Sequence, residues 1–285
     1  MKAKNACIPC IMKQAYNTAR RATKDTVKIR KILDETANYC QTLDLDQAPA
    51  DASNYVYEMT REITGNDDPY REEKKRYNDL CLGMIDDLRR EIEKRDDPLY
   101  AAARVAILGN VIDLGIGYAF DLDEELKNIF SVTLPQDDFK DFKQTVSSGR
   151  KNILYLADNC GEIVFDRLFI ERLKENHDVT LVVKQGPIIN DATMIDAEYV
   201  GLKSMVRTID TGSASIGVRW SMVSEEFVAA YDAADVIVSK GQGNFETMSD
   251  RDKDIYFLLR AKCDSVADML GVKTGDIVFK RGPVK

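Results

Sequence analysis

The positions of apolar and polar residues divide the chain into two parts with different periodicities. Over the first 120 residues, apolar residues recur at the three- and four-residue spacing of amphipathic helices. From Asn152 onward, short apolar runs alternate with helical segments, which is typical of a parallel sheet covered by helices on both faces. We therefore expect a helical domain over residues 1–120 and an α/β domain over residues 151–285, joined by a connecting segment at 121–150.

The N-terminal part reads as a series of helices separated by short polar breaks. The spacing of apolar residues predicts helix over Cys10–Leu43 and over Arg71–Lys94, with a loop at Gly65–Pro69 between them. Asp97-Pro98 is typical of a helix start, because Asp caps helices and Pro suits the first turn. The stretch Ala101–Phe120 is the most apolar of the chain. Polar residues interrupt it, so we expect a buried helix and no membrane span.

The C-terminal part predicts six strands and four helices in alternation. The strands are expected at Ile153–Ala157, Val179–Val183, Met205–Ile209, Val236–Ser239, Ile255–Leu259 and Ile277–Lys280. The helices are expected at Ile163–Leu173, Ala192–Tyr199, Ser224–Tyr231 and Ser265–Leu270. The fold class that follows is α/β, with a mostly parallel sheet, helices on both faces and an additional all-helical part at the N-terminus.

Polar residues follow three of the predicted strands at the point where each strand ends. Asp158 and Asn159 follow the first strand, Asn190 and Asp191 the loop after the second, and Lys240 begins a glycine-rich stretch after the fourth. Ligands bind outside the carboxyl ends of the strands in open α/β sheets. Any one of these pairs is common in ordinary turns. Their occurrence at three strand ends predicts a functional site.

The residue types at these strand ends suit a metal and a phosphate. Two carboxylates and an amide oxygen, from Asp158, Asn159 and Asp191, suit Mg²⁺ or Mn²⁺ better than Zn²⁺. Lys240 and the backbone amides of Gly241–Gly243 could bind a phosphoryl group. A divalent metal beside a phosphoryl oxygen acts as a Lewis acid. We therefore expect a metal-dependent hydrolase of phosphate esters, acting on a small phosphorylated metabolite.

Four motifs in this order resemble the damage-control phosphatase family, long known as domain of unknown function eighty-nine. They are Gly109-Asn110-Val111-Ile112-Asp113, Ala157-Asp158-Asn159-Cys160-Gly161-Glu162, Gly186-Pro187-Ile188-Ile189-Asn190-Asp191 and Lys240-Gly241-Gln242-Gly243-Asn244-Phe245-Glu246. The N-terminal Cys7-Ile8-Pro9-Cys10 is similar to the archaeal subfamily. The resemblance spans nearly the whole chain and implies a helical part packed on a Rossmann-like part. It also implies removal of damaged or surplus phosphorylated metabolites, including sugar phosphates.

The resemblance assigns roles to individual residues. It implies that Asp158, Asn159 and Asp191 hold the metal, which would be Mn²⁺ or Mg²⁺, with Ni²⁺ and Co²⁺ also fitting. It places Lys240 and Asn244 near the substrate phosphate. Further residues expected around the substrate are Gly241, Gly243, Asn190 and, at the edge of the cleft, Asn110 and Asp113. Catalysis would rest on Asp158, Lys240 and Asn110, with either a metal-bound water or Asp158 itself attacking phosphorus.

Two other interpretations of the sequence stay open. Gly115 and Gly117 resemble the glycine-rich turn of an S-adenosylmethionine-dependent methyltransferase, although the segment before them reads as helix where that motif needs a strand. Cys7 and Cys10 have zinc-type spacing, and Cys40 or Cys81 could complete a site in a non-catalytic binding module. A redox pair or plain thiols fit Cys7 and Cys10 equally well.

Charge and composition narrow the classes of partner and compartment. The chain has 285 residues and a net charge of −8, and a protein that binds nucleic-acid phosphates normally carries a basic face, so we expect no nucleic-acid partner. The first twelve residues lack the apolar segment of a signal peptide, which favours the cytoplasm. In that compartment the six cysteines are expected as thiols or ligands.

Overall fold

The computed structural model describes residues 1–111 and 130–284 and, within these, not the side chains of residues 108, 110 and 111. The helices are α1 (Cys7–Ala22), α2 (Thr26–Gln41), α3 (Pro49–Thr64), α4 (Arg71–Leu82), α5 (Ile85–Glu93), α6 (Pro98–Val111), α8 (Phe139–Ser147), α9 (Glu162–Leu173), α10 (Met194–Tyr199), α11 (Glu225–Ala233), α12 (Gln242–Met248) and α13 (Asp264–Leu270). The strands are β1 (Asn152–Leu156), β2 (Asp178–Val183), β3 (Arg207–Asp210), β4 (Val236–Lys240), β5 (Ile255–Arg260) and β6 (Ile277–Arg281).

The six strands form one sheet in the order β3-β2-β1-β4-β5-β6. The first five are parallel, and β6 runs antiparallel to β5 at the edge. The chain moves outward from β1 to β2 and β3, and then returns to add β4 on the other side of β1. This reversal is a topological switch point, where parallel sheets leave a crevice at their carboxyl edge. The ends of β1 and β4 therefore flank the place where a ligand is expected.

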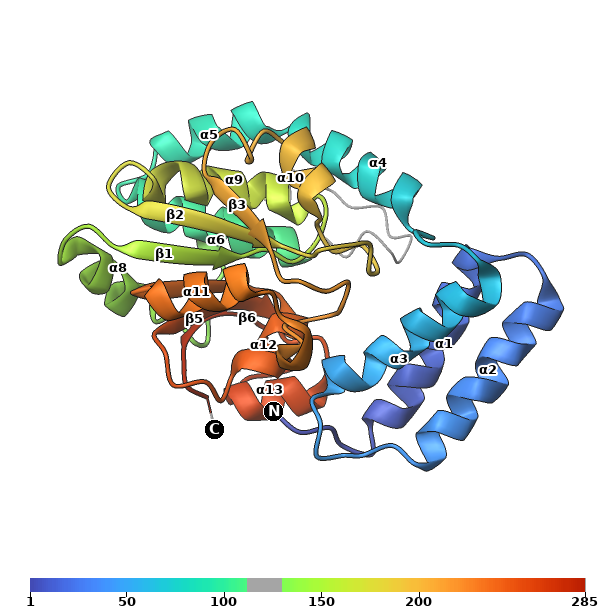
Figure 1. The fold of residues 1–285 in the computed structure, drawn as a ribbon. Helices are drawn as coiled ribbons and strands as arrows, with labels where there is room; N and C mark the ends of the chain where they lie inside the picture. The colour runs from blue at the N-terminus through green and yellow to red at the C-terminus, as the bar shows by residue number, and fades with distance from the viewer. Residues whose placement is uncertain (112–129, 285) are drawn as a thin grey trace.

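Helices cover both faces of the sheet, as the sequence predicted (Figure 1). Helices α6 and α9 pack on the face that carries Tyr155, Val238 and Tyr256. Helices α11, α12 and α13 lie against the other face, which carries Leu154, Ile237 and the neighbouring buried residues. Alternate residues of each central strand thus enter two separate cores, which is the pattern of a doubly covered parallel sheet.

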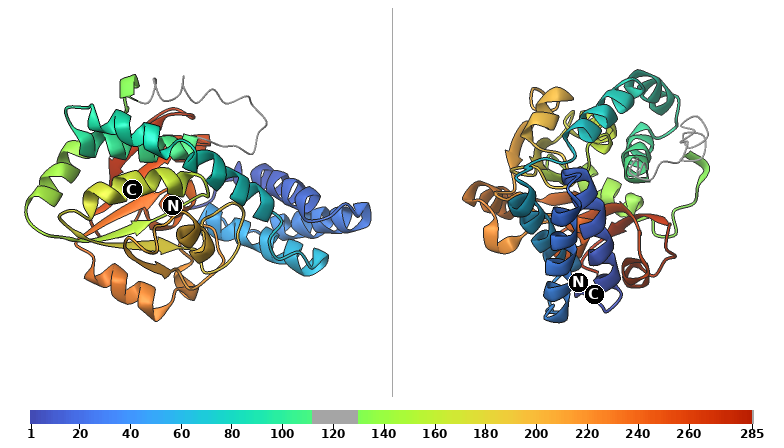
Figure 2. Two further views of the ribbon diagram at one scale, coloured as in Figure 1. Left: turned by 90° about the horizontal axis from the view of Figure 1, so that it is seen from above. Right: turned by 90° about the vertical axis from the view of Figure 1, so that its right-hand side faces the viewer.

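The N-terminal helices divide into two groups, unlike the single helical unit expected over residues 1–120. Helices α1, α2 and α3 pack around their own small core and extend beside the sheet (Figures 1 and 2). Helices α4, α5 and α6 share the core of the sheet instead, through buried residues such as Cys81, Leu88 and Ile107. The reason is that α6 is apolar around most of its circumference, so it requires burial on more than one side.

The structure contains helix boundaries that the sequence interpretation merged or omitted. The stretch expected as one helix over Cys10–Leu43 is α1 and α2, because the Asp25 side chain accepts a hydrogen bond from the Val27 amide at 2.8 Å and starts a new helix. The stretch Arg71–Lys94 breaks at Gly83 into α4 and α5. Helix α8 occupies part of the expected connection at 121–150, and α12 begins within the glycine-rich stretch after β4.

Helix α6 lies against the start of α9 at one glycine. An ideal Cβ placed on Gly109 would come within 2.9 Å of the Cα atom of Glu162, so the two backbones approach each other closely there. This contact fixes the first turn of α9 relative to the sheet. No helix within the described residues is long and apolar enough to cross a bilayer.

Candidate active site

The loops after β1 and β2 are joined by backbone hydrogen bonds that bring the predicted metal-binding residues together. The Cys160 amide donates to the Asn190 carbonyl at 2.8 Å, and the Ala192 amide donates to the Asp158 carbonyl at 2.7 Å. These bonds flank a short antiparallel bridge between Asn159 and Asp191. Two loops that are 30 residues apart in the sequence therefore behave as one rigid unit, and Asp158, Asn159 and Asp191 line the same cavity.

The Asp158 carboxylate packs directly against the backbone that follows β4. An ideal Cβ on Gly241 would lie 1.9 Å from the Asp158 Oδ2 atom, so only glycine leaves room for this carboxylate. Gly241 also has a φ of +79°, a conformation that residues with a side chain rarely adopt. Both constraints place a glycine at the switch point between β1 and β4.

The surroundings of these residues hold more buried negative than positive charge. The buried acidic side chains are Asp158, Glu162, Asp166, Asp191 and Asp196, and the buried lysines beside them are Lys74, Lys184 and Lys240. Burial raises the pKa of Asp158 well above its ordinary value, and the charge of Asp191 raises it further. Burial likewise raises the pKa of Asp191 to about 6, although Lys184 opposes this effect.

Among the residues that the structure describes, two oxygen atoms in the cluster, Asp166 Oδ2 and Asp191 Oδ2, are buried without a hydrogen bond, and of the two residues Asp191 lines the cavity. Asp191 Oδ2 is buried and accepts none, and its ion-pair distance to Lys184 Nζ is 3.8 Å. A buried carboxylate oxygen without a donor is costly unless a cation compensates it. Asp191 and Asp158, with the amide of Asn159, form an oxygen donor set beside a buried excess of negative charge. This arrangement fits a divalent cation.

The cavity above these residues lies between the N-terminal three-helix unit and the carboxyl edge of the sheet, and its volume is about 370 Å³. From α1, α3 and α4 it is lined by Gln14, Asn17, Thr18, Arg21, Ala50, Ser53, Tyr57, Glu73 and Tyr77, and Tyr70 precedes α4. From the sheet side it is lined by Asp158, Asn159, Ile189, Asn190, Asp191, Ile216, Gln242, Gly243, Glu246 and Lys262. A molecule in the cavity would contact both parts of the protein.

Lys240 and Asn244 lie behind the cavity wall, and neither is part of its lining. The Lys240 ammonium donates to Glu162 Oε1 at 2.5 Å, to Asp166 Oδ1 at 2.6 Å and to the Ala106 carbonyl at 2.8 Å. The Asn244 amide donates to the carbonyls of Ala157 and Lys240 and accepts from Lys184 Nζ. This placement corrects the expectation that Lys240 and Asn244 face a substrate phosphate, because their polar groups are occupied inside the protein.

The remaining predicted residues occupy different positions. Asn190 and Gly243 line the cavity, and Gly241 lies behind the Asp158 carboxylate. The Asn110 side chain, Asp113 and the Gly115/Gly117 turn lie outside the described residues.

Two cationic residues of the cavity lining were missed by the sequence interpretation. Lys262 follows β5 and lines the same cavity as Asp158 and Asp191, and its charge lowers the pKa of both carboxyl groups. Arg21 comes from α1, and its Nε atom donates to Glu73 Oε2 at 3.1 Å. Lys262 lies after a predicted strand, so the rule that ligands bind at strand ends could have found it. Arg21 carried no comparable signal.

Cys7 and Cys10 lie at the start of α1 and are both free. The Cys10 Sγ atom accepts a hydrogen bond from the Gln14 side chain at 3.3 Å. Cys40 belongs to the three-helix unit and Cys81 to the core of the sheet. Among residues 1–111 and 130–284, no group of three or more His, Cys, Asp and Glu side chains is placed to hold a metal ion. A closed zinc site around Cys7 and Cys10 therefore finds no support there.

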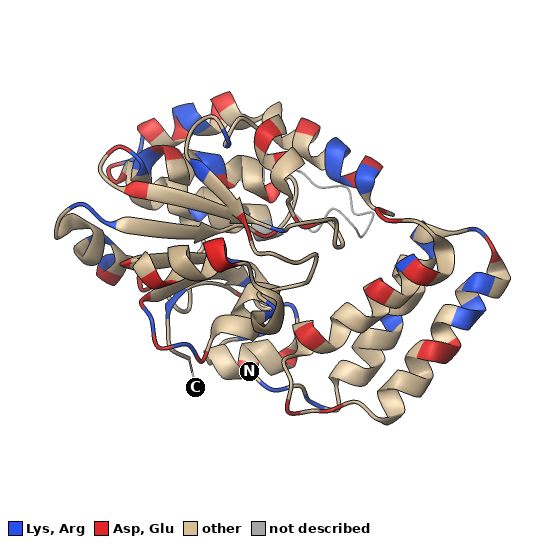
Figure 3. Cartoon of the chain, in the orientation of Figure 1, with Lys and Arg blue, Asp and Glu red and all other residues tan. Residues whose placement is uncertain are grey.

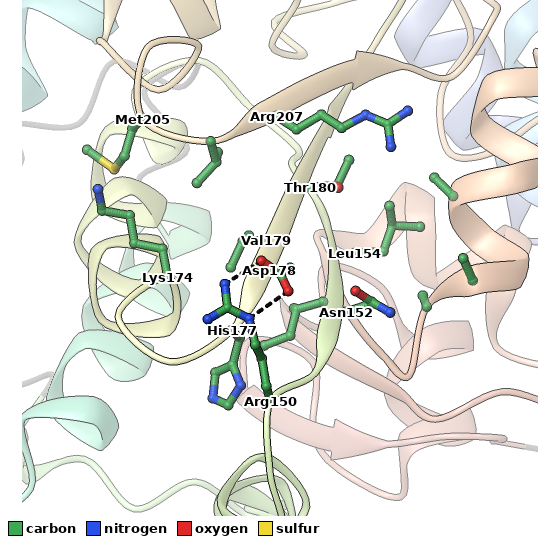
Figure 4. Close-up of a pocket in the computed structure, with 15 residues that line it drawn as sticks. Arg150, Asn152, Leu154, Lys174, His177, Asp178, Val179, Thr180, Met205 and Arg207 are labelled. Carbon is green, nitrogen blue, oxygen red and sulfur yellow. Dashed lines mark hydrogen bonds and ion pairs between the residues drawn. The ribbon is translucent and has the colours of Figure 1, made fainter.

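A second hollow lies at the opposite edge of the sheet, beside the amino ends of β1, β2 and β3 (Figure 4). Its volume, about 590 Å³, is larger than that of the first cavity. Arg150 at its rim is paired with Asp178 at 2.5 and 2.7 Å, and Lys174 and Arg207 extend away from that pair. The charged groups do not converge on a common point, so size alone does not make this hollow the functional site.

Glu246 on α12 is a buried acid in the wall of the first cavity. Its Oε1 atom accepts a hydrogen bond from the Gln242 side chain at 2.8 Å. Burial raises the pKa of Glu246 from 4.5 to about 7, while the nearby N-terminal ammonium lowers it and the Asp51 carboxylate raises it. The folded protein therefore favours the neutral form of this side chain.

We predict that Gly241→Ala removes the site and destabilises the fold. The new Cβ would overlap the Asp158 carboxylate, and the positive φ adds a backbone cost on the order of 1–3 kcal/mol. Gly65→Ala is the matched control, since Gly65 has a φ of +72° and open space around it. Chemical denaturation and divalent-metal titration of both variants check this. Equal losses in the two variants would contradict the steric role of Gly241.

We predict that Glu246→Gln becomes more stable than the wild type as pH rises. Because the folded-state pKa of Glu246 is raised, its contribution to stability is complete below pH 4.5 and is lost as pH rises through about 7. The glutamine escapes this loss. Between pH 5 and pH 8 the difference in free energy of unfolding should change by roughly 3 kcal/mol in favour of the variant, at about 1.4 kcal/mol per pKa unit. Urea denaturation at both pH values measures it, and a constant difference would refute it.

Comparison with known proteins gives matches over nearly the whole chain. The family model of the damage-control phosphatase ARMT1-like domain matches residues 3–278. A damage-control phosphatase of Pyrococcus horikoshii is 37% identical over 290 residues, and the alignment covers 100% of this chain and 100% of the relative. A damage-control phosphatase of Archaeoglobus fulgidus is 33% identical over 288 residues, which cover 98% of this chain and 99% of the relative.

A solved structure agrees with these sequence matches. The crystal structure of a protein of the domain-of-unknown-function-89 family from Pyrococcus horikoshii superposes with a TM-score of 0.91 at 36% identity, and 99% of each chain is covered. The sequence resemblance and the mixed α/β fold are thus confirmed over the same length. The chain belongs to the damage-control phosphatase ARMT1-like family.

Proposed function

We propose that this protein is a divalent-metal-dependent phosphatase, with Asp158, Asn159 and Asp191 as the metal-binding residues. One observation carries the proposal. The bridge between the loops after β1 and β2 gathers these three side chains on the wall of one cavity, where Asp191 Oδ2 is buried without a hydrogen bond. Membership of the damage-control phosphatase family supports phosphatase activity.

The donor atoms indicate which metals would bind. Carboxylate and amide oxygens favour Mg²⁺ or Mn²⁺, and Co²⁺ and Ni²⁺ also accept such ligands. A bound divalent ion would polarise a phosphoryl oxygen and lower the pKa of a bound water. The protein supplies the charge balance for this ion, because the five buried carboxylates Asp158, Glu162, Asp166, Asp191 and Asp196 outnumber the three buried lysines beside them, Lys74, Lys184 and Lys240.

The cavity lining indicates how a phosphorylated substrate would be held. We assign the phosphate contact to Lys262, because its charge acts on both Asp158 and Asp191 and it lies on the sheet side of the cavity. Arg21 supplies a second positive charge from α1, where Glu73 orients it. Polar side chains of the three-helix unit, among them Gln14 and Asn17, would contact the rest of the molecule. A volume of about 370 Å³ suits a small metabolite.

The first test is phosphate release from a panel of sugar phosphates and nucleotides by metal-stripped protein supplied with Mn²⁺, Mg²⁺, Co²⁺ or Ni²⁺. We expect metal-dependent release that falls at least about 100-fold in Asp158→Asn and Asp191→Asn, since changes even to residues behind metal ligands cost about 10–100-fold. Asp178→Asn is the control, because Asp178 is exposed at the opposite edge of the sheet. Release that survives loss of both carboxylates, or that needs no metal, would overturn the proposal.

A second test separates binding from the metal site. Lys262→Met should raise KM for a phosphorylated substrate by about 10-fold or more, because a charge-assisted hydrogen bond contributes about 1.5–3 kcal/mol. Divalent-metal affinity should rise or stay the same, since a positive neighbour of the carboxylates is removed. Lys273→Met, at an exposed position remote from the cavity lining, is the control. An unchanged KM would remove Lys262 from the substrate site.

A further inference from the structure

We propose that Glu162, held in place by Lys240, determines which end of the Asn159 side-chain amide faces the metal site. This inference rests on the proposed function of Asn159 as a metal-binding residue. It concerns a hydrogen-bonded series of three side chains, running from Lys240 on β4 through Glu162 at the start of α9 to Asn159 after β1. The series gives buried Lys240 a role as a positioning residue.

The first member, Lys240, is fixed by its acceptors. Its side chain is completely buried, and its ammonium makes three hydrogen bonds, to Glu162 Oε1, Asp166 Oδ1 and the Ala106 carbonyl. An ammonium group has three N–H donors, so none is left for another partner. Asp166 is fixed in turn by the Tyr155 hydroxyl, which donates to it at 2.7 Å. Lys240 therefore presents one constant donor to Glu162.

The second member, Glu162, cannot move away from this donor. Its Oε1 atom accepts from Lys240, and its Oε2 atom accepts from Asn159 Nδ2 at 3.3 Å. Its backbone is pressed against Gly109 of α6, where even one added methyl group would come within 2.9 Å of the Glu162 Cα. The two carboxylate oxygens thus have distinct partners, one facing the core and the other facing the metal site.

The third member, Asn159, is oriented by two acceptors. Its Nδ2 group donates to Asp158 Oδ2 at 2.8 Å and to Glu162 Oε2 at 3.3 Å. Its Oδ1 atom accepts no hydrogen bond from the residues that the structure describes, and the side chain lines the cavity. A reversed amide would direct its oxygen at two carboxylates and its N–H groups toward a cation. Glu162 therefore keeps the oxygen of Asn159 available as a ligand.

Glu162→Gln tests this directly, because it changes one atom type and keeps the shape. Lys240 needs an acceptor, so the glutamine oxygen should take the place of Oε1 and its NH₂ group should face Asn159. That NH₂ group would oppose the Asn159 Nδ2 group, so only Asp158 Oδ2 would still favour the native orientation, and a reversed Asn159 amide would accept from the glutamine. We expect the Kd for Mn²⁺, measured by calorimetry on metal-stripped protein, to rise about 10–100-fold, the range for partners behind a metal ligand.

Asp166→Asn is the matched control for this variant. Asp166 is buried, carries a carboxylate and contacts the same lysine, but none of its hydrogen bonds is with Asn159. We expect its Mn²⁺ affinity to stay within about twofold of the wild type, because Lys240 keeps its hydrogen bond to Glu162 Oε1 and Glu162 Oε2 keeps its hydrogen bond from Asn159 in this variant. Thermal unfolding with a chelator confirms that both variants fold. A loss of affinity in Asp166→Asn equal to that in Glu162→Gln would overturn the orienting role.

A double variant shows whether orientation is the cause. A carboxylate at position 159 offers oxygen whichever way it turns, and it can accept from the glutamine NH₂ group. Asn159→Asp should therefore bind Mn²⁺ more tightly in the Glu162→Gln background than in the native background, where two carboxylates would oppose each other. The expected coupling is about 10-fold in Kd. Additive effects would show that Glu162 acts only by packing.

The wild type supplies a measurement that does not depend on the folding of Glu162→Gln. The side-chain NH₂ resonances of Asn159, identified by their absence in Asn159→Asp, should exchange slowly with solvent both with and without Mg²⁺. Fast exchange of these protons would contradict the hydrogen bonds that orient the amide.

The metal measurements also distinguish this inference from the proposed function. Tight Mn²⁺ binding that depends on Glu162, in a protein that releases no phosphate from any substrate, would support the inference and count against the phosphatase. Phosphate release by the wild type, together with unchanged Mn²⁺ affinity in Glu162→Gln, would support the phosphatase and contradict the orienting role of Glu162. A wild type without Asp158-dependent Mn²⁺ binding would overturn both.

Discussion

The burial of several carboxylates at one point of the sheet is the constraint on which the rest of the structure depends. Asp158 and Asp191 come from different loops, yet the bridge between Asn159 and Asp191 leaves them no room to separate. Burial raises the pKa of both side chains, and the charge of Asp191 raises that of Asp158 further, so the site is unfavourable without a compensating cation. The two loops stay together despite this unfavourable burial of charge, because backbone hydrogen bonds and not the side chains join them.

The three buried lysines, Lys74, Lys184 and Lys240, compensate only part of this charge, and none of them lines the cavity. Lys240 neutralises the acids at the start of α9, Glu162 and Asp166, while Lys184 at the end of β2 lies 3.8 Å from Asp191 and donates to the Gly217 carbonyl at 2.6 Å. The internal cations thus compensate the cavity-facing carboxylates only in part, and that is where a bound metal would contribute most.

The strands and the strand-end residues could be predicted from the sequence because both follow from local pattern. Short apolar runs gave the six strands within a few residues, and the switch-point rule pointed to the loops that carry Asp158 and Asp191. The prediction for Lys240 was wrong because it did not consider the direction in which the side chain leaves β4. Val236 and Val238 face α6 and α9, so alternation along β4 directs Lys240 toward the same helices. Glu162 and Asp166 lie four residues apart on a buried helix, and this pair of acids indicated a partner for a buried lysine.

The contribution of the N-terminal helices could not be predicted, because it depends on how two cores are placed relative to each other. Periodicity marked residues 1–120 as helical, yet it could not show that α1–α3 pack around a separate core while α6 packs on α9. Contacts between residues far apart in the sequence determine where α1–α3 lie relative to the sheet. The Arg61 guanidinium donates to the Pro187 carbonyl at 2.9 Å, and the Ile216 amide donates to Asn54 Oδ1 at 2.8 Å. These bonds place α3 over the loops of the site.

The two walls of the cavity come from different parts of the protein. The carboxylates, the lysines behind them and Gly241 all belong to the sheet, where close backbone contacts leave little freedom. The opposite wall of the cavity comes from α1, α3 and α4. Of these helices, α1 and α3 pack around their own core and not on the core of the sheet. Substitutions in α1 and α3 can therefore change the shape and polarity of the cavity while the geometry of Asp158, Asn159 and Asp191 stays fixed.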